Sequence, residues 1–266
     1  MTVQFCGSRG HSAFLNIIPR RVYYISITLV LTGHVIQCRH GRHTATRKAG
    51  AVADSETATP FQHPRFARAF ARFVPGMDRR GAAGHRRAIV SPLSGRVVEI
   101  GAGTGATFRF YPPAVNDVLA LEPDDYLRAI ATREARDAPV PVRVQRGHSE
   151  AIPVAGGSVD AVVVSLLLCS VPDQGRALAE ISRVLRPGGI LAFYEHVRSH
   201  NRILAAGEDL ITPAFCRVAG GCHPNRDTVQ AITEAGFVVD ELQRFGFSVR
   251  RFVPPVAHVV GHAVKR

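Results

Sequence analysis

The chain has 266 residues, 46% of them hydrophobic, so it is long and apolar enough for a packed domain, and disorder throughout is excluded. Its net charge of +12 is uneven: residues 1–90 carry 14 Arg and Lys against 3 Asp and Glu, whereas residues 91–266 carry 19 against 18. This balance argues against a nucleic-acid partner, and the 31 Arg against 2 Lys are more typical of a GC-rich genome than of a phosphate-binding surface.

Residues 1–59 are predicted to form a leader that is separate from a domain at 60–266. Val22–Gly33 is apolar and follows two arginines, as in a signal peptide, yet no small-x-small cleavage site follows it. As a membrane span, Val22–Cys38 is at the lower limit of length. A poorly ordered extension, a membrane anchor and a targeting segment stay open, so we expect a cytoplasmic protein with possible weak membrane association.

The domain is expected to begin with helices. Phe66, Phe70 and Phe73 recur at the spacing of one helix face, and the pair Pro75-Gly76 predicts the end of that helix. A second helical stretch is expected to follow, laid against a sheet.

From residue 96 onward, predicted strands and helices alternate. This order predicts a parallel sheet with helices on both faces, that is, an α/β fold of the doubly wound, Rossmann-like kind. Val162–Val164 is apolar at consecutive positions, as expected of a strand that is buried on both sides. The expected strands are Arg96–Ile100, Asp117–Leu121, Val140–Val144, Val159–Leu168, Gly189–Tyr194, Val238–Leu242 and Ser248–Phe252. The expected helices among them are Asp124–Ala135, Gly175–Leu185 and Asp227–Ala235.

A glycine-rich loop follows the first expected strand. Gly101, Ala102 and Gly103 bring bare backbone close to a ligand, and a following helix N-terminus adds N–H donors. The same glycines with Ala106 also satisfy the dinucleotide fingerprint G-x-G-x-x-G/A. An NAD-dependent oxidoreductase is therefore an alternative at this point.

Two acidic residues lie near this loop. Glu99 would repel a pyrophosphate but attract a ligand that carries an ammonium and a sulfonium, as S-adenosylmethionine does. Glu122, at the end of the next strand, is placed to accept hydrogen bonds from two ribose hydroxyls. Because NAD binding predicts the second acid as well, only Glu99 favours S-adenosylmethionine.

A turn at Arg186–Gly189 completes an ordered set of motifs. In chain order these are Glu99–Gly105, Glu122, Gly147–Pro153, Ser158–Val162 and Arg183–Gly189. With them the sequence resembles the class I S-adenosylmethionine-dependent methyltransferases of the small-molecule type. Further stretches are similar to the methyltransferase-like thiol methyltransferase subgroup, a likeness that fixes acceptor chemistry poorly. These stretches are Leu168–Asp173, Glu195–Val197 and Gly221–Thr228.

The resemblance implies a set of cofactor-binding residues. These are Glu99, Gly101, Ala102, Gly103, Glu122, His148, Ser149, Glu150 and Ser165. The glycines and Glu99 are expected at the methionine part, Glu122 at the ribose, and Ser165 near the sulfonium. His148 stands where the family often has an acid, and with its two neighbours it is expected beside the adenine.

The acceptor side is expected at the ends of the fourth and fifth strands. Glu195 and His196 lie where a side chain reaches the acceptor, and an imidazole has a suitable pKa for a general base. An acceptor thiol would need no dedicated base. Cys169 lines the pocket or is a buried apolar residue. The insert Arg198–Arg226 is expected to cover the pocket with apolar side chains.

The five cysteines predict neither a disulfide scaffold nor a zinc ribbon. They are odd in number, widely spaced and lack a Cys-x-x-Cys pair, which makes a reducing compartment the simplest setting. Cys216, Cys222 and His223 lie close in sequence, but a second spaced pair is missing. We therefore predict no metal site.

The function predicted is transfer of a methyl group from S-adenosylmethionine to a small, hydrophobic acceptor, either a thiol, a quinol, a phenol or a lipid-like molecule. The transfer is an in-line displacement, so positioning is the enzyme's main contribution. An NAD-dependent oxidoreductase and a non-catalytic cofactor-binding module are the alternatives.

Overall fold

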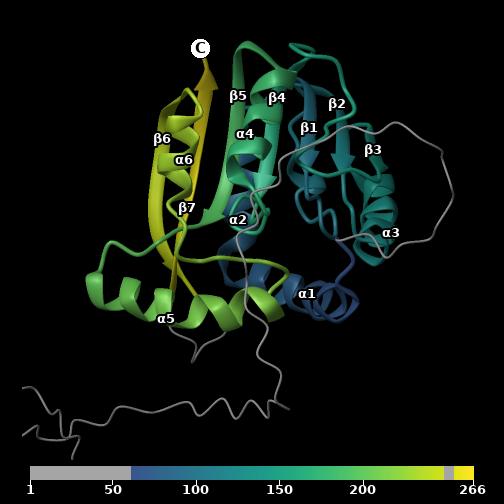
Figure 1. Cartoon of the computed structure of the whole chain (residues 1–266). Helices are drawn as coiled ribbons and strands as arrows, with labels where there is room; N and C mark the ends of the chain where they lie inside the picture. The colour runs from purple at the N-terminus through teal and green to yellow at the C-terminus, as the bar shows by residue number, and fades with distance from the viewer. Residues whose placement is uncertain (1–60, 249–254) are drawn as a thin grey trace, which may run out of the picture. The chain divides into compact units, whose positions relative to one another are not determined.

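The computed structural model describes residues 61–248 and 255–266, within a unit that extends from Glu56 to Arg266. The leader predicted at 1–59 lies outside the described residues, so its separation from the domain stays a prediction. The described residues form a seven-stranded sheet with flanking helices (Figure 1). Its strands are β1 Gly95–Ile100, β2 Val115–Leu121, β3 Val142–Gln145, β4 Val159–Ser165, β5 Leu185–His196, β6 Phe237–Phe247 and β7 Val256–Lys265.

The strand order in the sheet is β3-β2-β1-β4-β5-β7-β6. The first five strands are mutually parallel, and β7 inserts antiparallel between β5 and β6. The chain moves outward from β1 to β3 in one direction and from β4 in the other. Such a switch point leaves a crevice at the carboxyl ends of the central strands, where open α/β sheets bind ligands.

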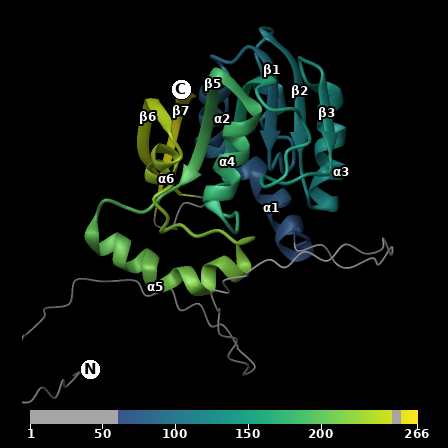
Figure 2. The same cartoon turned by 45° about the horizontal axis from the view of Figure 1, so that its top comes forward.

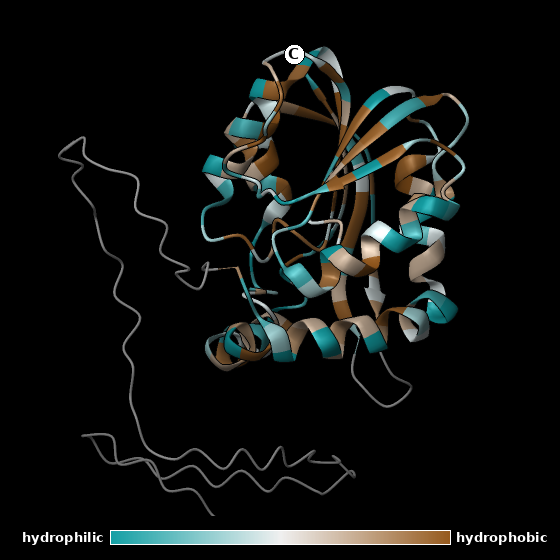
Figure 3. Ribbon diagram, turned by 90° about the vertical axis from the view of Figure 1, so that its right-hand side faces the viewer, coloured by the Kyte–Doolittle hydropathy of each residue, from teal (hydrophilic) through white to brown (hydrophobic). Residues whose placement is uncertain are grey.

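Helices cover both faces of the sheet, as predicted. Val98 of β1 and Val162 of β4 pack with α4 (Gln174–Val184) and α6 (Thr228–Glu234), while their neighbours Val97 and Ala161 pack with α2 (Ala83–Val90) and α3 (Asp125–Glu134). Hydrophobic residues follow the strands of the interior in Figure 3. The helices are α1 Pro64–Met77, α2 Ala83–Val90, α3 Asp125–Glu134, α4 Gln174–Val184, α5 Arg202–Val218 and α6 Thr228–Glu234. No helix among these described residues is long and apolar enough to cross a membrane.

The predicted end of the first helix is wrong. The helix continues through Pro75 to Met77, because Val74 and Met77 are both buried and packing outweighs local propensity. The break falls instead at Gly81, with a φ of 120°, inside the π-helical turn η1 Asp78–Ala82. The strand predicted at Ser248–Phe252 lies outside the described residues except for Ser248, which is in no strand, and the described β7 was not predicted.

The fourth strand is also shorter than predicted. It ends at Ser165, and Leu166 has a φ of 57°, a left-handed conformation that is rare for leucine. The Leu166 N–H donates to the carbonyl of Tyr194 at 2.7 Å, which fixes this bend against β5. The three leucines expected to finish the strand therefore form the turn at its carboxyl end. Strain of this kind gathers at functional sites.

Candidate active site

The glycine-rich loop after β1 turns back onto β2. The N–H groups of Gly101 and Ala102 both donate to the carbonyl of Leu121, at 2.8 and 3.1 Å. Gly101 and Gly103 have φ values of 68° and 57°, and a Cβ on Gly101 would lie 2.7 Å from the Leu167 side chain. The backbone conformation therefore favours glycine at position 101, and a Cβ there would also displace the end of the Leu167 side chain.

Glu122 fixes this loop from the end of β2. Its Oε2 accepts the N–H of Gly103 at 2.7 Å, and its Oε1 accepts the N–H of Asp124 at 2.9 Å. Burial raises the pKa of Glu122 to about 7, although these two backbone hydrogen bonds lower it. Each oxygen keeps a lone pair for a ribose hydroxyl.

A cavity of about 620 Å³ lies over the carboxyl ends of the central strands. Five of the predicted cofactor-binding residues line it, namely Gly101, Glu122, His148, Ser149 and Glu150. The volume is in the range of small-molecule sites, and it suits a ligand of the size of a nucleoside. The structure thus brings the predicted ribose and adenine residues together.

The third loop of the motif set forms one wall of this cavity. The His148 ring stacks on Phe61, with ring centroids 5.0 Å apart, and Glu150 pairs with Arg176 at 3.2 Å. Ser149 is buried between them. An apolar ring stack next to backbone polar groups is a suitable surface for a purine.

Glu99 lies in a second, much smaller cavity of about 20 Å³, which Ala102, Gly103 and Ser165 also line. The side chain is 2% exposed, and the Tyr111 hydroxyl donates to its Oε2 at 2.7 Å. Burial raises the pKa of Glu99 to about 7, although the hydrogen bond from Tyr111 lowers it. A space of this size holds a water or an ammonium group rather than a whole methionine chain.

Glu195, the first predicted catalytic residue, is held by backbone groups. Its Oε1 accepts the N–H groups of Leu167 and Leu168, both at 2.9 Å, and its Oε2 accepts that of Cys169 at 3.1 Å. The residue is 0% exposed, and burial raises its pKa to about 7. The carboxylate is engaged by these three backbone donors, and its predicted catalytic role stays a prediction. Glu195 holds the turn that follows β4.

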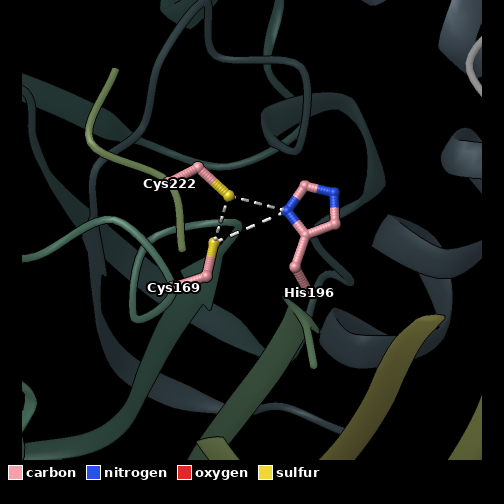
Figure 4. A group of neighbouring side chains, drawn as sticks. All are labelled: Cys169, His196 and Cys222. Atoms are coloured by element: carbon pink, nitrogen blue, oxygen red, sulfur yellow. Dashed lines mark hydrogen bonds between the residues drawn. The ribbon is translucent and has the colours of Figure 1, made fainter. Parts of the chain in front are cut away.

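His196, the second predicted catalytic residue, lies against two cysteines. Its Nδ1 is 3.6 Å from the Sγ of Cys169 and 3.2 Å from the Sγ of Cys222, and the two sulfurs are 3.6 Å apart (Figure 4). Cys169 belongs to the turn after β4, His196 ends β5, and Cys222 lies in the loop after α5. Three segments therefore deliver two thiols and an imidazole to one point, a set of groups that can hold a metal ion.

The three groups alter one another's ionisation. The hydrogen bond between the thiols, together with His196, lowers the pKa of Cys222, whereas the same hydrogen bond and burial raise that of Cys169. Burial lowers the pKa of His196, but Cys222, Glu195 and Glu208 together raise it, so the net direction is upward. The arrangement favours a negative sulfur beside the imidazole.

The ligand set considered from sequence proximity is not the one that forms. The Cys216 thiol contacts the carbonyl of Pro213 at 3.5 Å, and the His223 Nδ1 lies 2.6 Å from the carbonyl of Gly221. Only Cys222 of that set joins the cluster, and its partners come from the ends of β4 and β5.

The insert between β5 and α6 does not offer the predicted apolar lining. Helix α5 lies with α1 at the end of the sheet where β4 and β5 finish (Figures 1 and 2). Its side chains Ile203 and Leu210 are 83% and 82% exposed, because Ala205, Glu208 and Thr212 form the buried side of the helix. The insert contributes Gly220 and Gly221 to the large cavity instead.

Several lining residues were missed by sequence reasoning. Phe61, Phe66 and Arg176 line the large cavity, and a Cβ on Gly220 would lie 2.6 Å from the Phe66 ring. The Gly220-Gly221 pair was a visible signal of close packing, although nothing in the sequence indicated its partner.

Known proteins resemble this chain in sequence and in fold. The family described as "Methyltransferase domain" matches residues 98–193. Thiol S-methyltransferase TMT1B of Homo sapiens is 34% identical over 178 residues, covering 65% of this chain and 72% of the relative. Thiol S-methyltransferase TMT1A of the same species is 36% identical over 176 residues, covering 64% and 70%. A solved S-adenosylmethionine-dependent methyltransferase of Thermotoga maritima, titled a possible histamine N-methyltransferase, is 25% identical with a TM-score of 0.57, covering 76% of this chain and 97% of that one.

A doubly wound sheet with a cavity of this volume at its switch point is typical of α/β proteins that bind a nucleoside or nucleotide ligand. The relatives in sequence and in fold identify which cofactor and which reaction class apply. The chain belongs to the class I S-adenosylmethionine-dependent methyltransferases. The predicted fold, enzyme class and cofactor are thereby confirmed, and the NAD alternative is set aside.

Proposed function

We propose that the chain methylates the sulfur atom of a small thiol. The observation that carries this proposal is the hydrogen bonding of Glu195. Its carboxylate accepts three backbone N–H groups near the carboxyl end of β5, where the acceptor is expected to bind. With both oxygens of Glu195 used in this way, β5 presents no carboxylate base to an acceptor. An acceptor that loses its proton easily is therefore favoured.

The difference between thiols and hydroxyl acceptors is large enough to matter. A thiol has a pKa of about 8.5 and a phenol of about 10, so near neutral pH a thiol ionises with about 2 kcal/mol less assistance. The names of the two human relatives support the same acceptor class. A quinol or phenol would need a dedicated base, and the Nδ1 of His196, the base predicted for that role, is turned toward two cysteines.

The residues that would hold the cofactor follow from the two cavities. Glu122 would bind the ribose hydroxyls, His148 and Ser149 the adenine, and Glu99 the amino group at the edge of the glycine loop. S-adenosylmethionine supplies a methyl group on a positively charged sulfur when bound. The protein's part is to align an acceptor with that methyl group and to exclude water.

Matched acceptor pairs test the proposal. The purified full chain is incubated with methyl-labelled S-adenosylmethionine and either benzyl mercaptan or benzyl alcohol, and in parallel with thiophenol or phenol. We expect label in the thioethers and none in the ethers. Methylation of phenol or of a quinol, with no thioether formed by protein that binds S-adenosylhomocysteine, would contradict thiol methylation.

A further inference from the structure

The cluster of Cys169, His196 and Cys222 is compact. All three ligand atoms lie within 4.8 Å of one another, and no fourth His, Cys, Asp or Glu of the described ranges joins them. Cys169 and Cys222 are 0% and 5% exposed. Buried cysteine is common as a small apolar residue, but two thiols that both face one imidazole nitrogen are not explained by packing alone.

The distances agree with those around a tetrahedral zinc ion. Zinc bonds of about 2.3 Å to sulfur and about 2.0 Å to nitrogen, at tetrahedral angles, separate two sulfurs by about 3.8 Å and a sulfur from a nitrogen by about 3.5 Å. The observed separations are 3.6 Å between the sulfurs and 3.6 and 3.2 Å from sulfur to nitrogen. A disulfide would need the sulfurs at about 2.05 Å, so the cluster has the spacing of ligands rather than of a covalent pair.

The backbone around the cluster is tied in place. The Cys169 N–H donates to Glu195 at 3.1 Å, and the His223 N–H donates to the Cys169 carbonyl at 2.8 Å, which joins the turn after β4 to the loop after α5. The Cys222 N–H donates to the Ala219 carbonyl at 3.2 Å. The ligand positions are thus set before an ion binds, as metal sites require.

A buried acid lies next to the cluster. The Glu195 carboxylate is directly behind Cys169, since its Oε2 accepts the Cys169 N–H at 3.1 Å. Arg226 donates to the carbonyls of Leu168 and Val171 at 3.1 and 2.6 Å, so its guanidinium is engaged by the backbone of the same turn. A buried carboxylate next to the two sulfurs makes the cluster better suited to a cation than to an anion.

We propose that Cys169, Cys222 and His196 bind a zinc ion, and that its fourth position takes the acceptor thiol. The second half of this inference rests on the proposed thiol-methylating function. Zinc sites with three protein ligands and one open position are those that act on substrates. Ser170 and Gly221, the chain neighbours of the two cysteines, line the 620 Å³ cavity, so the cluster lies beside the cofactor site. The prediction of no metal site, made from Cys216, Cys222 and His223, is replaced by this one.

The chemistry of such a site is balanced without a further reactant. The acceptor R–SH binds zinc through its sulfur and releases its proton to solvent, which leaves a metal-bound thiolate at neutral pH. Its sulfur then forms the bond to the methyl carbon while the bond from that carbon to the cofactor's sulfonium breaks. The electron pair of the broken bond stays on the cofactor's sulfur, and the neutral thioether is a weaker ligand that leaves the ion.

Metal content tests the first half of the inference independently of activity. The full chain, Cys169→Ser, Cys222→Ser and the control Cys216→Ser are loaded with zinc, passed over a mild chelating resin with a phosphine reductant, and analysed by elemental mass spectrometry. We expect the control to keep the wild-type content and the two cluster variants to lose about one zinc per chain. Zinc held elsewhere in the chain is common to all four proteins and cancels in the comparison.

Two results would overturn the zinc site. One is a wild-type content equal to that of Cys222→Ser, and the other is an equal loss in Cys216→Ser. S-adenosylhomocysteine binding is measured on each variant to show that the domain is folded. A variant that loses this binding is replaced by His196→Gln, for which the same loss of zinc is expected.

Cobalt substitution tests the open position. Thiolate-to-cobalt charge-transfer absorption grows with the number of sulfur ligands, so benzyl mercaptan should raise it from the level of two thiolates to that of three. Benzyl alcohol should leave it unchanged. Unchanged absorption with benzyl mercaptan, while cobalt stays bound, would overturn the acceptor half of the inference. Increased absorption without any methyl transfer would keep the metal site and refute the proposed function, so the two failures are distinguishable.

Discussion

Replacement of Glu99 by Gln tests whether a buried acid at the end of β1 is kept for the cofactor at a cost to stability. The side chain is 2% exposed, and burial raises its pKa from 4.5 to about 7. A raised pKa in the folded state means that the stability contribution of this group is fully present below pH 4.5. That contribution is lost as the pH rises through 7.

The size of the effect follows from the shift. A difference of about 2.5 pH units corresponds to about 3 kcal/mol in the free energy of unfolding at pH 8. Glu99→Gln keeps the shape and an acceptor for the Tyr111 hydroxyl, and it removes the charge. We expect the variant without cofactor to be more stable than the wild type at pH 8 by up to about 3 kcal/mol, or about 6–12 °C in Tm. At pH 5 the two proteins should be nearly equal.

Thermal unfolding of both proteins from pH 5 to 8 measures this difference. Glu122 and Glu195 also have raised pKa values, but they are common to both proteins and cancel. In the same samples, Glu99→Gln should weaken the binding of S-adenosylhomocysteine and leave that of methylthioadenosine, which lacks the amino acid part. A difference in Tm that does not change with pH would refute the buried-charge reasoning. Equal weakening of both ligands would refute the assignment of Glu99 to the amino group.

Two further substitutions probe the cofactor loop. Gly101→Ala places a Cβ 2.7 Å from the Leu167 side chain at a φ of 68°, and S-adenosylhomocysteine affinity should fall at least tenfold by calorimetry, a loss of about 1.4 kcal/mol or more. Gly157→Ala has a similar φ of 64° with open space around it, so it should cost stability alone, and equal affinity in the two variants would contradict the steric argument. Glu122→Gln leaves one of two backbone N–H groups facing an amide NH₂, at a cost of about 1–3 kcal/mol that the removal of a buried charge offsets at pH 8, so nucleoside binding should weaken while the unfolding free energy changes little. The exposed control Glu234→Gln should change neither quantity.

The signals of the predicted cofactor site are local, so its glycines and acids could be placed on the fold from the sequence. Positive φ at Gly101 and Gly103 follows from residue type and spacing, and the acids Glu99 and Glu122 stand at strand ends that the alternation of apolar runs defines. The burial of each was not predictable, since it depends on α1 and the side chains that cover the loop. The length of β4 was predicted wrongly for the same reason. The strained Leu166 is held by a hydrogen bond to β5, and this contact cannot be read from the sequence.

The acceptor half was predictable only in part because its contacts are long-range. Cys169 and Cys222 are 53 positions apart, and their approach depends on how the insert with α5 returns to the sheet. Proximity along the chain therefore pointed to Cys216 and His223, which face elsewhere. The apolar lining expected from α5 was wrong for a similar reason, because an amphipathic pattern does not show which side of a helix faces the domain.

The positions of the buried acids support the proposal of sulfur chemistry at the acceptor end. Glu99, the last residue but one of β1, and Glu122, directly after β2, lie beside cavities, where a bound cofactor can use their remaining lone pairs. Glu195 is the last residue but one of β5 and is enclosed, and its oxygens hold the turn that carries Cys169. This carboxylate therefore fixes the backbone of one member of the cluster next to His196. An acceptor thiol bound to a zinc ion at this cluster would need no carboxylate base, so the proposed function and the proposed metal site rest on the same geometry.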